Sequence, residues 1–434
     1  MDETEENRMN KDSQFYGKYL ETLTMELVPA MGCTEPIAIA YAAAKARETL
    51  GQRPEKVVIE VSGNIVKNVK SVIVPHTGGM KGIAAAAVAG IIAGDASREL
   101  EVISTVTQAQ IVEMKDYLNQ TLIEMKCAKS DFIFDIGVHV FAGEHSSFVR
   151  VVDTHTNVVL IEKDGIPLFS KKIEIKGKIA GPDRSFITVE EIIDFANTVN
   201  LSDVEEVIQR QIDFNLAIAT EGLTNSYGAN VGKVLLKSGG NDIKNLAKAY
   251  AAAGSDARMN GCEMPVIINS GSGNQGMTAS IPVIIYAKEK NISGEKLIRA
   301  LVVSNLVTIH LKTGIGRLSA YCGAVSAGSG CGAGIAYLEG GQYKEVAHTI
   351  VNSLAIVSGM ICDGAKASCA AKIAAAVDSG ILGYYMYKDG QQFYDGEGLV
   401  IKGVENTICN FGKLASIGMC NTDKEIIKIM VGEE

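Results

Sequence analysis

The sequence has no block of lysine and arginine residues that would form a positively charged patch. Its 50 acidic residues outnumber the 41 basic ones, and the formal net charge is −9. Nucleic-acid surfaces are basic, so this balance argues against a nucleic-acid partner. Only 21% of the residues are charged, which indicates that much of the chain is buried. We expect a subunit interface to contribute to this burial, in a homodimer.

A membrane-spanning segment is not indicated either. The longest stretch with few charges, residues 318–338, consists mainly of glycine, alanine and serine. A spanning helix is normally rich in leucine, isoleucine, valine and phenylalanine, whereas small residues suit close helix packing around a site. Residues 1–13 are acidic and polar and contain no apolar signal region. We therefore expect a cytoplasmic protein that does not enter a membrane, with a membrane carrier as the least favoured alternative.

Several catalytic signatures are missing. There is no H-E-x-x-H sequence, and the six histidines are scattered, which disfavours a zinc hydrolase. The G-x-S-x-G sequence that positions a nucleophilic serine is absent, and so is a Walker A phosphate loop. Close C-x-x-C pairs, which are typical of structural zinc sites and ferredoxins, are absent as well.

The chain does contain nine cysteines. Without a secretory signal they are expected to be reduced, so disulfides are a poor explanation for them. A buried cysteine often serves simply as a small apolar side chain. A functional role therefore depends on whether some of the nine gather in one place.

The length of 434 residues is too great for one ordinary core and predicts at least two domains. We expect an α+β protein with a mostly helical catalytic domain at 190–434. An α/β domain with a mixed or antiparallel sheet is predicted at 52–185, inserted after N-terminal helices at 14–50 that pack on the catalytic domain. Helical periodicity supports helices at 16–26 and 37–50.

The sheet of the inserted domain is predicted from runs of β-branched residues and from alternation of apolar and polar residues. An Ala-rich helix is expected at 83–93, and residues 188–200 begin with a capping-box pattern, Thr188 followed by Glu191. The expected strands are residues 57–61, 69–74, 100–106, 131–145, 147–154, 157–163 and 167–173.

The sequence MGCTEP at 31–36 interrupts the N-terminal helical region. Thr34, shortly before Pro36, resembles a helix N-cap followed by a proline in the first turn. This would place Cys33 at a helix N-terminus, where the helix dipole favours a thiolate. The alternatives are that Cys33 caps the helix, packs in the core or contacts a metal cluster.

Two glycine-rich stretches could contribute to a binding site. In residues 269–276, NSGSGNQG, consecutive glycine and serine residues let backbone N–H groups converge on a carboxylate or a phosphate. A plain tight turn explains this stretch equally well. In the second stretch, HTGGMKG at 76–82, His76 and Lys81 could close over a substrate or could belong to an ordinary exposed turn.

Two later stretches carry cysteines among small residues. Cys322 and Cys331 lie in the sequence YCGAVSAGSGCGAG, and Cys362 and Cys369 lie in GMICDGAKASC. Seven positions separate the last two, so on a continuous helix they would share a face. Gly364 makes a loop between them equally plausible. Spacing alone does not identify a metal cluster.

The combination of four motifs resembles the L-cysteine desulfidase family, which is akin to the α-subunit of iron–sulfur L-serine dehydratases. Each motif is weakly specific alone, but together they are specific, and the likeness covers nearly the whole chain after its first residues. The motifs are MGCTEP at 31–36, SGSGNQG at 270–276, CGAVSAG at 322–328 and MICDGAKASC at 360–369.

The resemblance implies an oxygen-sensitive [4Fe–4S] cluster held by three cysteines, with one iron left open to the substrate. Carried over motif by motif, the ligand role falls to Cys322, Cys362 and Cys369, and not to Cys331. In the serine enzymes a C-terminal cysteine can cap the open iron. This chain ends in VGEE, so such capping is not expected.

The implied reaction is β-elimination from a small amino acid. An open iron is a Lewis acid that makes the β-sulfur or β-hydroxyl a better leaving group, while a base removes the α-proton. Cys33 is the candidate for proton transfer. The candidate substrate-binding residues are Ser270, Gly271, Ser272, Gly273 and Asn274, as a carboxylate site, together with His76 and Lys81. Arg258 and Lys366 lie near the motifs and could bind anions or could be surface charges.

The substrate could be L-cysteine, giving pyruvate, ammonia and sulfide, or L-serine, giving pyruvate and ammonia. The MGCTEP motif favours the desulfidase without deciding the question. A pyridoxal-phosphate lyase stays open as an alternative, with its phosphate at 270–276 and Lys233 or Lys366 as the Schiff-base lysine. A non-enzymatic protein that senses oxygen or amino acids, through the cluster or the α/β domain, stays open as well.

Overall fold

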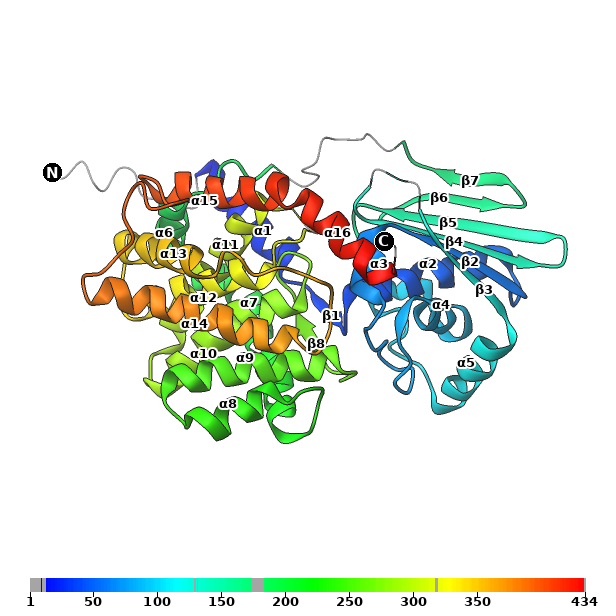
Figure 1. The fold of residues 1–434 in the computed structure, drawn as a ribbon, viewed down its shortest axis with the longest axis horizontal. Helices are drawn as coiled ribbons and strands as arrows, with labels where there is room; N and C mark the ends of the chain where they lie inside the picture. Colours follow the sequence, from blue (N-terminus) through cyan, green and yellow to red (C-terminus); the bar gives the residue numbers. More distant parts are fainter. Residues whose placement is uncertain are drawn as a thin grey trace.

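The structure is a computed structural model in which a helical region and a sheet region lie next to each other (Figure 1). It describes residues 9, 13–128, 130, 132–172, 183–316 and 319–432. The arrangement confirms the predicted α+β class, with a mixed sheet. The predicted strand ends at 131 and 173 lie outside the described residues.

The helical region surrounds one large apolar core. Its first helix begins where the Ser13 side chain accepts a hydrogen bond from the Phe15 N–H. Thr188 caps α6 through the Glu191 N–H, at the predicted position. The elements of this region are α1 (Gln14–Glu26), α6 (Val189–Thr198), α7 (Leu201–Thr224), α8 (Val231–Gly239), α9 (Ile243–Met259), α10 (Gly273–Glu289), α11 (Gly294–Thr313), α12 (Gly323–Leu338), α13 (Tyr343–Val357), α14 (Cys369–Lys388), α15 (Val404–Lys413) and the π-helical turn η2 (Leu414–Gly418).

The sheet region is built on strands in the order β3-β2-β4-β5-β6-β7. β2 and β3 pair in parallel, and the other neighbours pair antiparallel. The strands are β2 (Lys56–Val61), β3 (Leu122–Cys127), β4 (Asp135–Ala142), β5 (His145–Val152), β6 (Val158–Lys163) and β7 (Ile166–Ser170). The helices of this region are α2 (Thr34–Leu50), α3 (Gly63–Val69), α4 (Gly82–Ala93), the 3-10 helix η1 (Ala96–Glu101) and α5 (Gln108–Gln120).

Helix α2 packs in the sheet region, which corrects the prediction that both helices of 14–50 pack on the helical region. Its buried residues share a core with Val57 and Ile59 of β2, whereas α1 packs in the helical core. The physical reason is the run of alanines in α2, which lets α4 approach closely. A Cβ at Gly90 of α4 would overlap the Ala40 carbonyl oxygen of α2.

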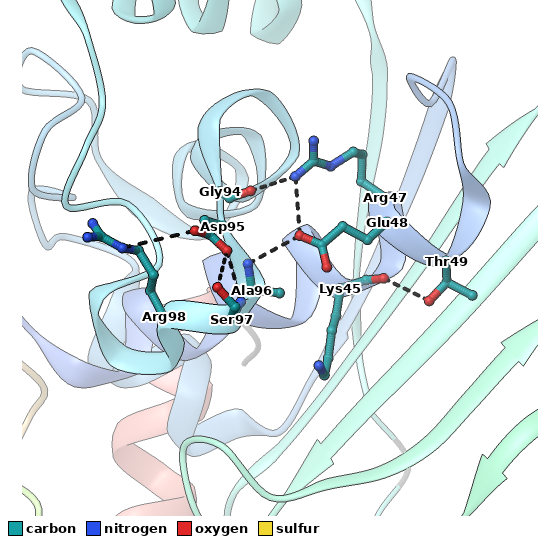
Figure 2. A network of polar contacts seen from close by, with 9 residues as sticks. All are labelled: Lys45, Arg47, Glu48, Thr49, Gly94, Asp95, Ala96, Ser97 and Arg98. Atoms are coloured by element: carbon teal, nitrogen blue, oxygen red, sulfur yellow. Dashed lines mark hydrogen bonds and ion pairs between the residues drawn. The ribbon is translucent and has the colours of Figure 1, made fainter.

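A polar network fixes the C-terminal end of α2 against the turn that follows α4 (Figure 2). Arg47 Nη2 donates to the Gly94 carbonyl oxygen at 2.5 Å, and the Ala96 N–H donates to Glu48 Oε1 at 3.2 Å. Asp95 in turn accepts the Ser97 N–H at 3.0 Å and so starts η1. With this end fixed, the N-terminus of α2 is directed at the junction between the two regions.

Two predicted strands of the inserted domain are wrong. Residues 63–69 form α3 and residues 70–74 an irregular connection, while residues 96–101 form η1. Their apolar residues, such as Val69 and Val102, are fully buried, and burial overrides the strand preference of β-branched side chains. Strand β3, which the sequence did not predict, lies at the edge of the sheet and is largely exposed, so its apolar pattern is weak.

The pair of β1 (Pro29–Met31) with β8 (Pro265–Ile267) and helix α16 (Cys420–Val431) are among the contacts between the regions. β1 pairs antiparallel with β8 just before the chain enters α2. At the other end of the sequence, α16 runs from the helical region to α3 (Figure 1). Within the described ranges, no helix has the length and apolar character needed to cross a membrane.

Candidate active site

A pocket of about 130 Å³ lies at the junction of the two regions. The helical region contributes the first turns of α10, α12 and α14, together with Arg258 and Lys312. The sheet region contributes the first turn of α2, part of α3 and residues next to β4 and β5. These last residues are Phe134, Asp153 and His155. The pocket therefore joins all four sequence motifs, which are far apart in the chain.

The N-termini of α2, α10, α12 and α14 all meet at this pocket. In each of these helices the N-cap side chain makes no capping hydrogen bond within the described chain. The first N–H groups of a helix lack intrahelical partners and carry the positive end of the helix dipole. The convergence of these helix ends creates a site that favours anions.

The glycine–serine motif forms a tight turn at the start of α10. The central residues, Ser270 and Gly271, have positive φ values of 50° and 79°. The flanking residues, Asn269 and Ser272, exchange backbone hydrogen bonds at 3.1 Å, as in a two-residue hairpin turn. Glycine suits this backbone because it has no Cβ. The turn leads directly into the N-terminus of α10, so the tight-turn and anion-site interpretations are compatible.

Buried amides hold this turn in place. The Ser270 hydroxyl donates to Asn269 Oδ1 at 2.8 Å, and Asn269 Nδ2 donates to Asn305 Oδ1 at 2.9 Å. The side chain of Asn305 is itself hydrogen-bonded to that of Gln211. Because these amides are fully buried and satisfied, the turn is preorganised before any ligand binds.

Cys33 is the N-cap of α2, one residue before the predicted cap Thr34. It is 3% exposed, and its thiol donates to Glu35 Oε2 at 3.0 Å. Burial and the neighbouring Glu35 carboxylate raise the pKa of the Cys33 thiol well above its ordinary value, although Arg258 acts in the opposite sense. This corrects the expected thiolate, because desolvation outweighs the helix dipole. Cys33 therefore holds its proton at rest.

Glu35 connects Cys33 to both regions of the protein. Its Oε2 atom also accepts the Thr34 hydroxyl at 3.2 Å, and its Oε1 atom accepts Asn68 Nδ2 at 3.0 Å. The Thr34 hydroxyl lies 3.3 Å from the Gly271 carbonyl oxygen. These hydrogen bonds hold the Glu35 carboxylate in one orientation in the first turn of α2, next to the anion site.

Cys322, Cys362 and Cys369 all line the pocket and are free thiols. Cys322 is the N-cap of α12, and Cys369 is the first residue of α14. Backbone hydrogen bonds set the segments of Cys322 and Cys362 side by side. The Cys322 N–H donates to the Met360 carbonyl oxygen at 3.1 Å, and the Cys362 N–H donates to that of Ala320 at 2.6 Å. A loop, and not a continuous helix, joins Cys362 to Cys369.

This loop is held firmly on both sides. At Gly364, φ is 94°, and a Cβ there would overlap the Lys67 carbonyl oxygen of α3. Asp363 pairs with Lys366 and with Lys372. Burial alone would raise the pKa of the Asp363 carboxyl, but hydrogen bonds from these two ammonium groups hold the pKa at about 2. The positions of the two cysteines that flank this loop are therefore fixed by contacts within the protein.

The cysteine end of the pocket combines protonated thiols with a buried cation. Burial and the neighbouring Cys362 raise the pKa of the Cys322 thiol to about 12, and burial raises that of Cys369 as well. Lys312 is 6% exposed; burial lowers the pKa of its ammonium to about 8, although Cys362 and Cys322 act in the opposite sense. Its ammonium has no hydrogen-bond or ion-pair partner in the described part of the chain.

Known proteins with similar sequences identify the family. Residues 97–428 match the family described as serine dehydratase alpha chain. A UPF0597 protein of Desulfitobacterium hafniense strain Y51 is 61% identical over 425 residues, which cover 98% of this chain and 99% of the relative. UPF0597 proteins of Lachnoclostridium phytofermentans and Treponema denticola are 52% and 46% identical, over 96% and 98% of this chain and 100% of each relative. The chain belongs to the serine dehydratase alpha chain family.

This membership confirms the kinship with serine dehydratases that the motifs predicted and indicates a lyase-type enzyme. The names of the UPF0597 relatives state neither a substrate nor a cofactor. The segment matched to the serine dehydratase alpha chain family contains the glycine–serine motif and the cysteines of α12 and α14, but it begins after Cys33. Membership of the narrower desulfidase family stays a prediction.

Iron–sulfur dependence is typical of serine dehydratases, and the pocket residues fit such a group. Three thiols, a buried ammonium and converging helix N-termini suit a negatively charged cluster with thiolate ligands. Buried polar atoms without a hydrogen-bond partner in the described chain also line the pocket, namely Arg258 Nε, Gln275 Oε1 and Tyr321 Oη. No three His, Cys, Asp or Glu side chains of the described residues are grouped to bind one metal ion. A cluster has a different requirement, because each cysteine binds a different iron.

The structure does not bring every predicted residue to the pocket. His76 and Lys81 do not line the pocket. The His76 ring is paired with the Glu263 carboxylate at 3.2 Å, and Lys81 is the exposed N-cap of α4. Gly273 does not line the pocket, although its neighbours Ser272 and Asn274 do, and a Cβ there would overlap Arg258 Nε. Cys331, to which no ligand role was assigned, is buried inside α12.

Other pocket residues were not predicted from the sequence. Glu35 is part of the MGCTEP motif, and its position two residues after Cys33 could have suggested a proton partner. Asn68 and Lys312 lie in no motif, and only the folded chain shows that they face the site. For the pyridoxal-phosphate alternative, neither Lys233 nor Lys366 lines the pocket.

Proposed function

We propose that the protein is an iron–sulfur-dependent lyase that eliminates the β-substituent of L-cysteine or L-serine. The observation that carries the proposal is that Cys322, Cys362 and Cys369, from separate segments, line one pocket with the glycine–serine turn. Membership of the serine dehydratase alpha chain family supports the same reaction class. The products are pyruvate and ammonia, with sulfide in addition from cysteine.

In this proposal Cys322, Cys362 and Cys369 hold a [4Fe–4S] cluster. When bound, such a cluster with one open iron supplies a Lewis acid for the β-hydroxyl or β-sulfur. The three thiols release their protons when they bind metal. The buried Lys312 ammonium then offsets part of the negative charge of the thiolates, which would otherwise be costly to bury.

The opposite side of the pocket binds the amino acid and moves its α-proton. The N-terminus of α10 and the turn at Ser270 bind the α-carboxylate. The Cys33 thiol passes its proton to Glu35, 3.0 Å away, and the thiolate formed accepts the proton from Cα. The electron pair of the broken C–H bond forms the Cα–Cβ double bond. The β-substituent leaves with the electron pair of its bond to Cβ and takes up the proton held by Glu35, which gives water or hydrogen sulfide and restores the Cys33 thiol and the Glu35 carboxylate. The 2-aminoacrylate released tautomerises and is hydrolysed to pyruvate and ammonia.

Iron and acid-labile sulfide, measured on protein purified without oxygen, test the proposal together with pyruvate release from L-cysteine and L-serine. We expect about four irons per chain, as a [4Fe–4S] cluster requires, and pyruvate from at least one substrate. Cys322→Ala should lose iron and turnover. Cys331→Ala is the matched control, because that cysteine is buried nine positions further along the same segment and outside the pocket.

The possible results separate the competing functions. Iron-free protein that still releases pyruvate would contradict the proposal and favour pyridoxal phosphate. Iron without turnover on either amino acid would favour a cluster-based sensor. The ratio of turnover on the two amino acids decides between a desulfidase and a serine dehydratase.

A further inference from the structure

Arg258 has a buried positive charge that no acidic side chain among the described residues neutralises. It lies in the last turn of α9, is 4% exposed and lines the pocket. Its Nη1 atom donates to Asn274 Oδ1 at 3.1 Å, and its Nε atom has no hydrogen-bond partner among the described residues. Burial of an unpaired charge is costly, so a guanidinium in this state indicates an anion that binds from outside the chain.

The acidic side chains of the described chain do not supply that anion. None of them forms an ion pair or a hydrogen bond with Arg258. Glu35, the carboxylate on the same side of the pocket, is already bonded by Cys33, Thr34 and Asn68. The guanidinium is therefore available to a ligand that enters the pocket.

The surroundings of Arg258 define which anion fits. The guanidinium packs against the first residue of α10, where a Cβ at Gly273 would overlap Nε. The N-cap of this helix, Ser272, makes no side-chain capping bond in the described structure, so the first N–H groups of α10 face the same space. A planar guanidinium beside helix N–H groups matches the two oxygens of a carboxylate.

We propose that Arg258 binds the α-carboxylate of the substrate and restricts the enzyme to amino acids with a free carboxylate. This inference rests on the proposed function and deepens it, because it assigns one named residue to substrate selection. Amidated or decarboxylated analogues, such as L-serinamide and cysteamine, would leave the guanidinium unpaired and would be rejected.

L-Alanine and L-alaninamide test this assignment without turnover, because both lack a β-leaving group and differ only in the carboxylate. Isothermal titration calorimetry on anaerobically purified protein measures the affinity of each. We expect L-alanine to bind on the order of 30-fold or more tightly than the amide, as for a buried charge pair. Arg258→Met should lose this difference, and Arg258→Lys should recover part of it. Arg53→Met, which removes an exposed arginine outside the pocket, should bind like the wild type.

The outcomes separate this inference from the proposed function. L-Alanine binding that is unchanged in Arg258→Met would overturn the inference, whatever the turnover. Equal wild-type affinity for L-alanine and its amide would overturn it even if the variants fail to fold. An Arg258-dependent preference for L-alanine in a protein that releases no pyruvate would support the inference while the lyase proposal fails.

Discussion

Glu35 accepts hydrogen bonds from three side chains in the pocket and is the proposed proton acceptor for Cys33. Glu35→Gln keeps an oxygen acceptor but cannot take the thiol proton. We expect kcat to fall about 100-fold or more with little change in KM, the usual loss when an acid–base group is removed. Exchange of the L-alanine α-proton in D2O, followed by NMR, should slow in parallel. Normal exchange in Glu35→Gln would contradict the assignment, and Glu113→Gln on the surface is the control.

Lys312 places a buried ammonium next to Cys322 and Cys362. Lys312→Met removes a buried positive charge beside the proposed thiolate ligands. We expect severalfold faster loss of iron to a chelator under anaerobic conditions. Lys296→Met, on the same helix and outside the pocket, should lose iron at the wild-type rate. Equal rates in the two variants would show that Lys312 has no part in holding the metal.

Close contact between α2 and α4 keeps the N-terminus of α2 at the pocket. Gly90→Ala would push its Cβ into the Ala40 carbonyl oxygen, and we expect a loss of about 1–3 kcal/mol in unfolding free energy. Gly17→Ala is the matched control, because Gly17 is exposed in α1 with open space around it, and should stabilise by about 0.5–1 kcal/mol. Urea unfolding measures both. A neutral Gly90→Ala would mean that α4 can move away from α2.

Asp256 connects α9 to the N-terminus of α8, where one carboxylate oxygen accepts the Gly232 N–H at 3.0 Å and the other has no partner within the described residues. Burial raises the pKa of the Asp256 carboxyl from 3.8 to about 6. Between these values the folded state binds more protons than the unfolded state. The stabilisation that the protonated Asp256 carboxyl gives the folded state is therefore complete below pH 3.8 and is lost as the pH rises to about 6.

Asp256→Asn keeps the acceptor for Gly232 and removes the buried charge. At pH 7.5 we expect it to be more stable than the wild type by about 1–3 kcal/mol, and the advantage should disappear towards pH 4. Chemical unfolding at the two pH values checks this. An advantage that does not change with pH would show that the charge of Asp256 is not the cause.

For individual helices and strands, the features that depend on nearby side chains could be predicted from the sequence. The cap at Thr188, most strands of the sheet and the helix that follows Cys33 were predicted from local patterns. Residues 69–74 were mistaken for a strand because their β-branched side chains are buried by contacts distant in sequence. The same limit applies to the site. Cys322, Cys362 and Cys369 lie in recognisable motifs. Arg258 could be named from its sequence position as an anion ligand or a surface charge, and only the structure shows that it is buried, whereas no local pattern indicates Lys312.

The two regions meet at the pocket, so the relative position of the regions determines its geometry. The helical region supplies the three cysteines, and the sheet region supplies Cys33 and Glu35. Helix α16 runs from the helical region to the sheet region and packs on α3 (Figure 1). The Ile427 side chain of α16 lies next to Gly63, the first residue of α3. We therefore expect the geometry of the pocket to depend on the contact between α16 and α3.

The ion pair between Lys67 of α3 and Asp423 of α16 is the buried part of this contact. Asp423→Asn would leave the Lys67 ammonium, whose side chain is 1% exposed, without a counter-charge. We expect a loss of about 3–5 kcal/mol in unfolding free energy and faster hydrogen exchange in α3 and α16. Glu425→Gln removes an exposed pair with Lys428 on the same helix and should change stability by less than about 1 kcal/mol. If both variants behave alike, the Lys67–Asp423 pair does not hold the regions together.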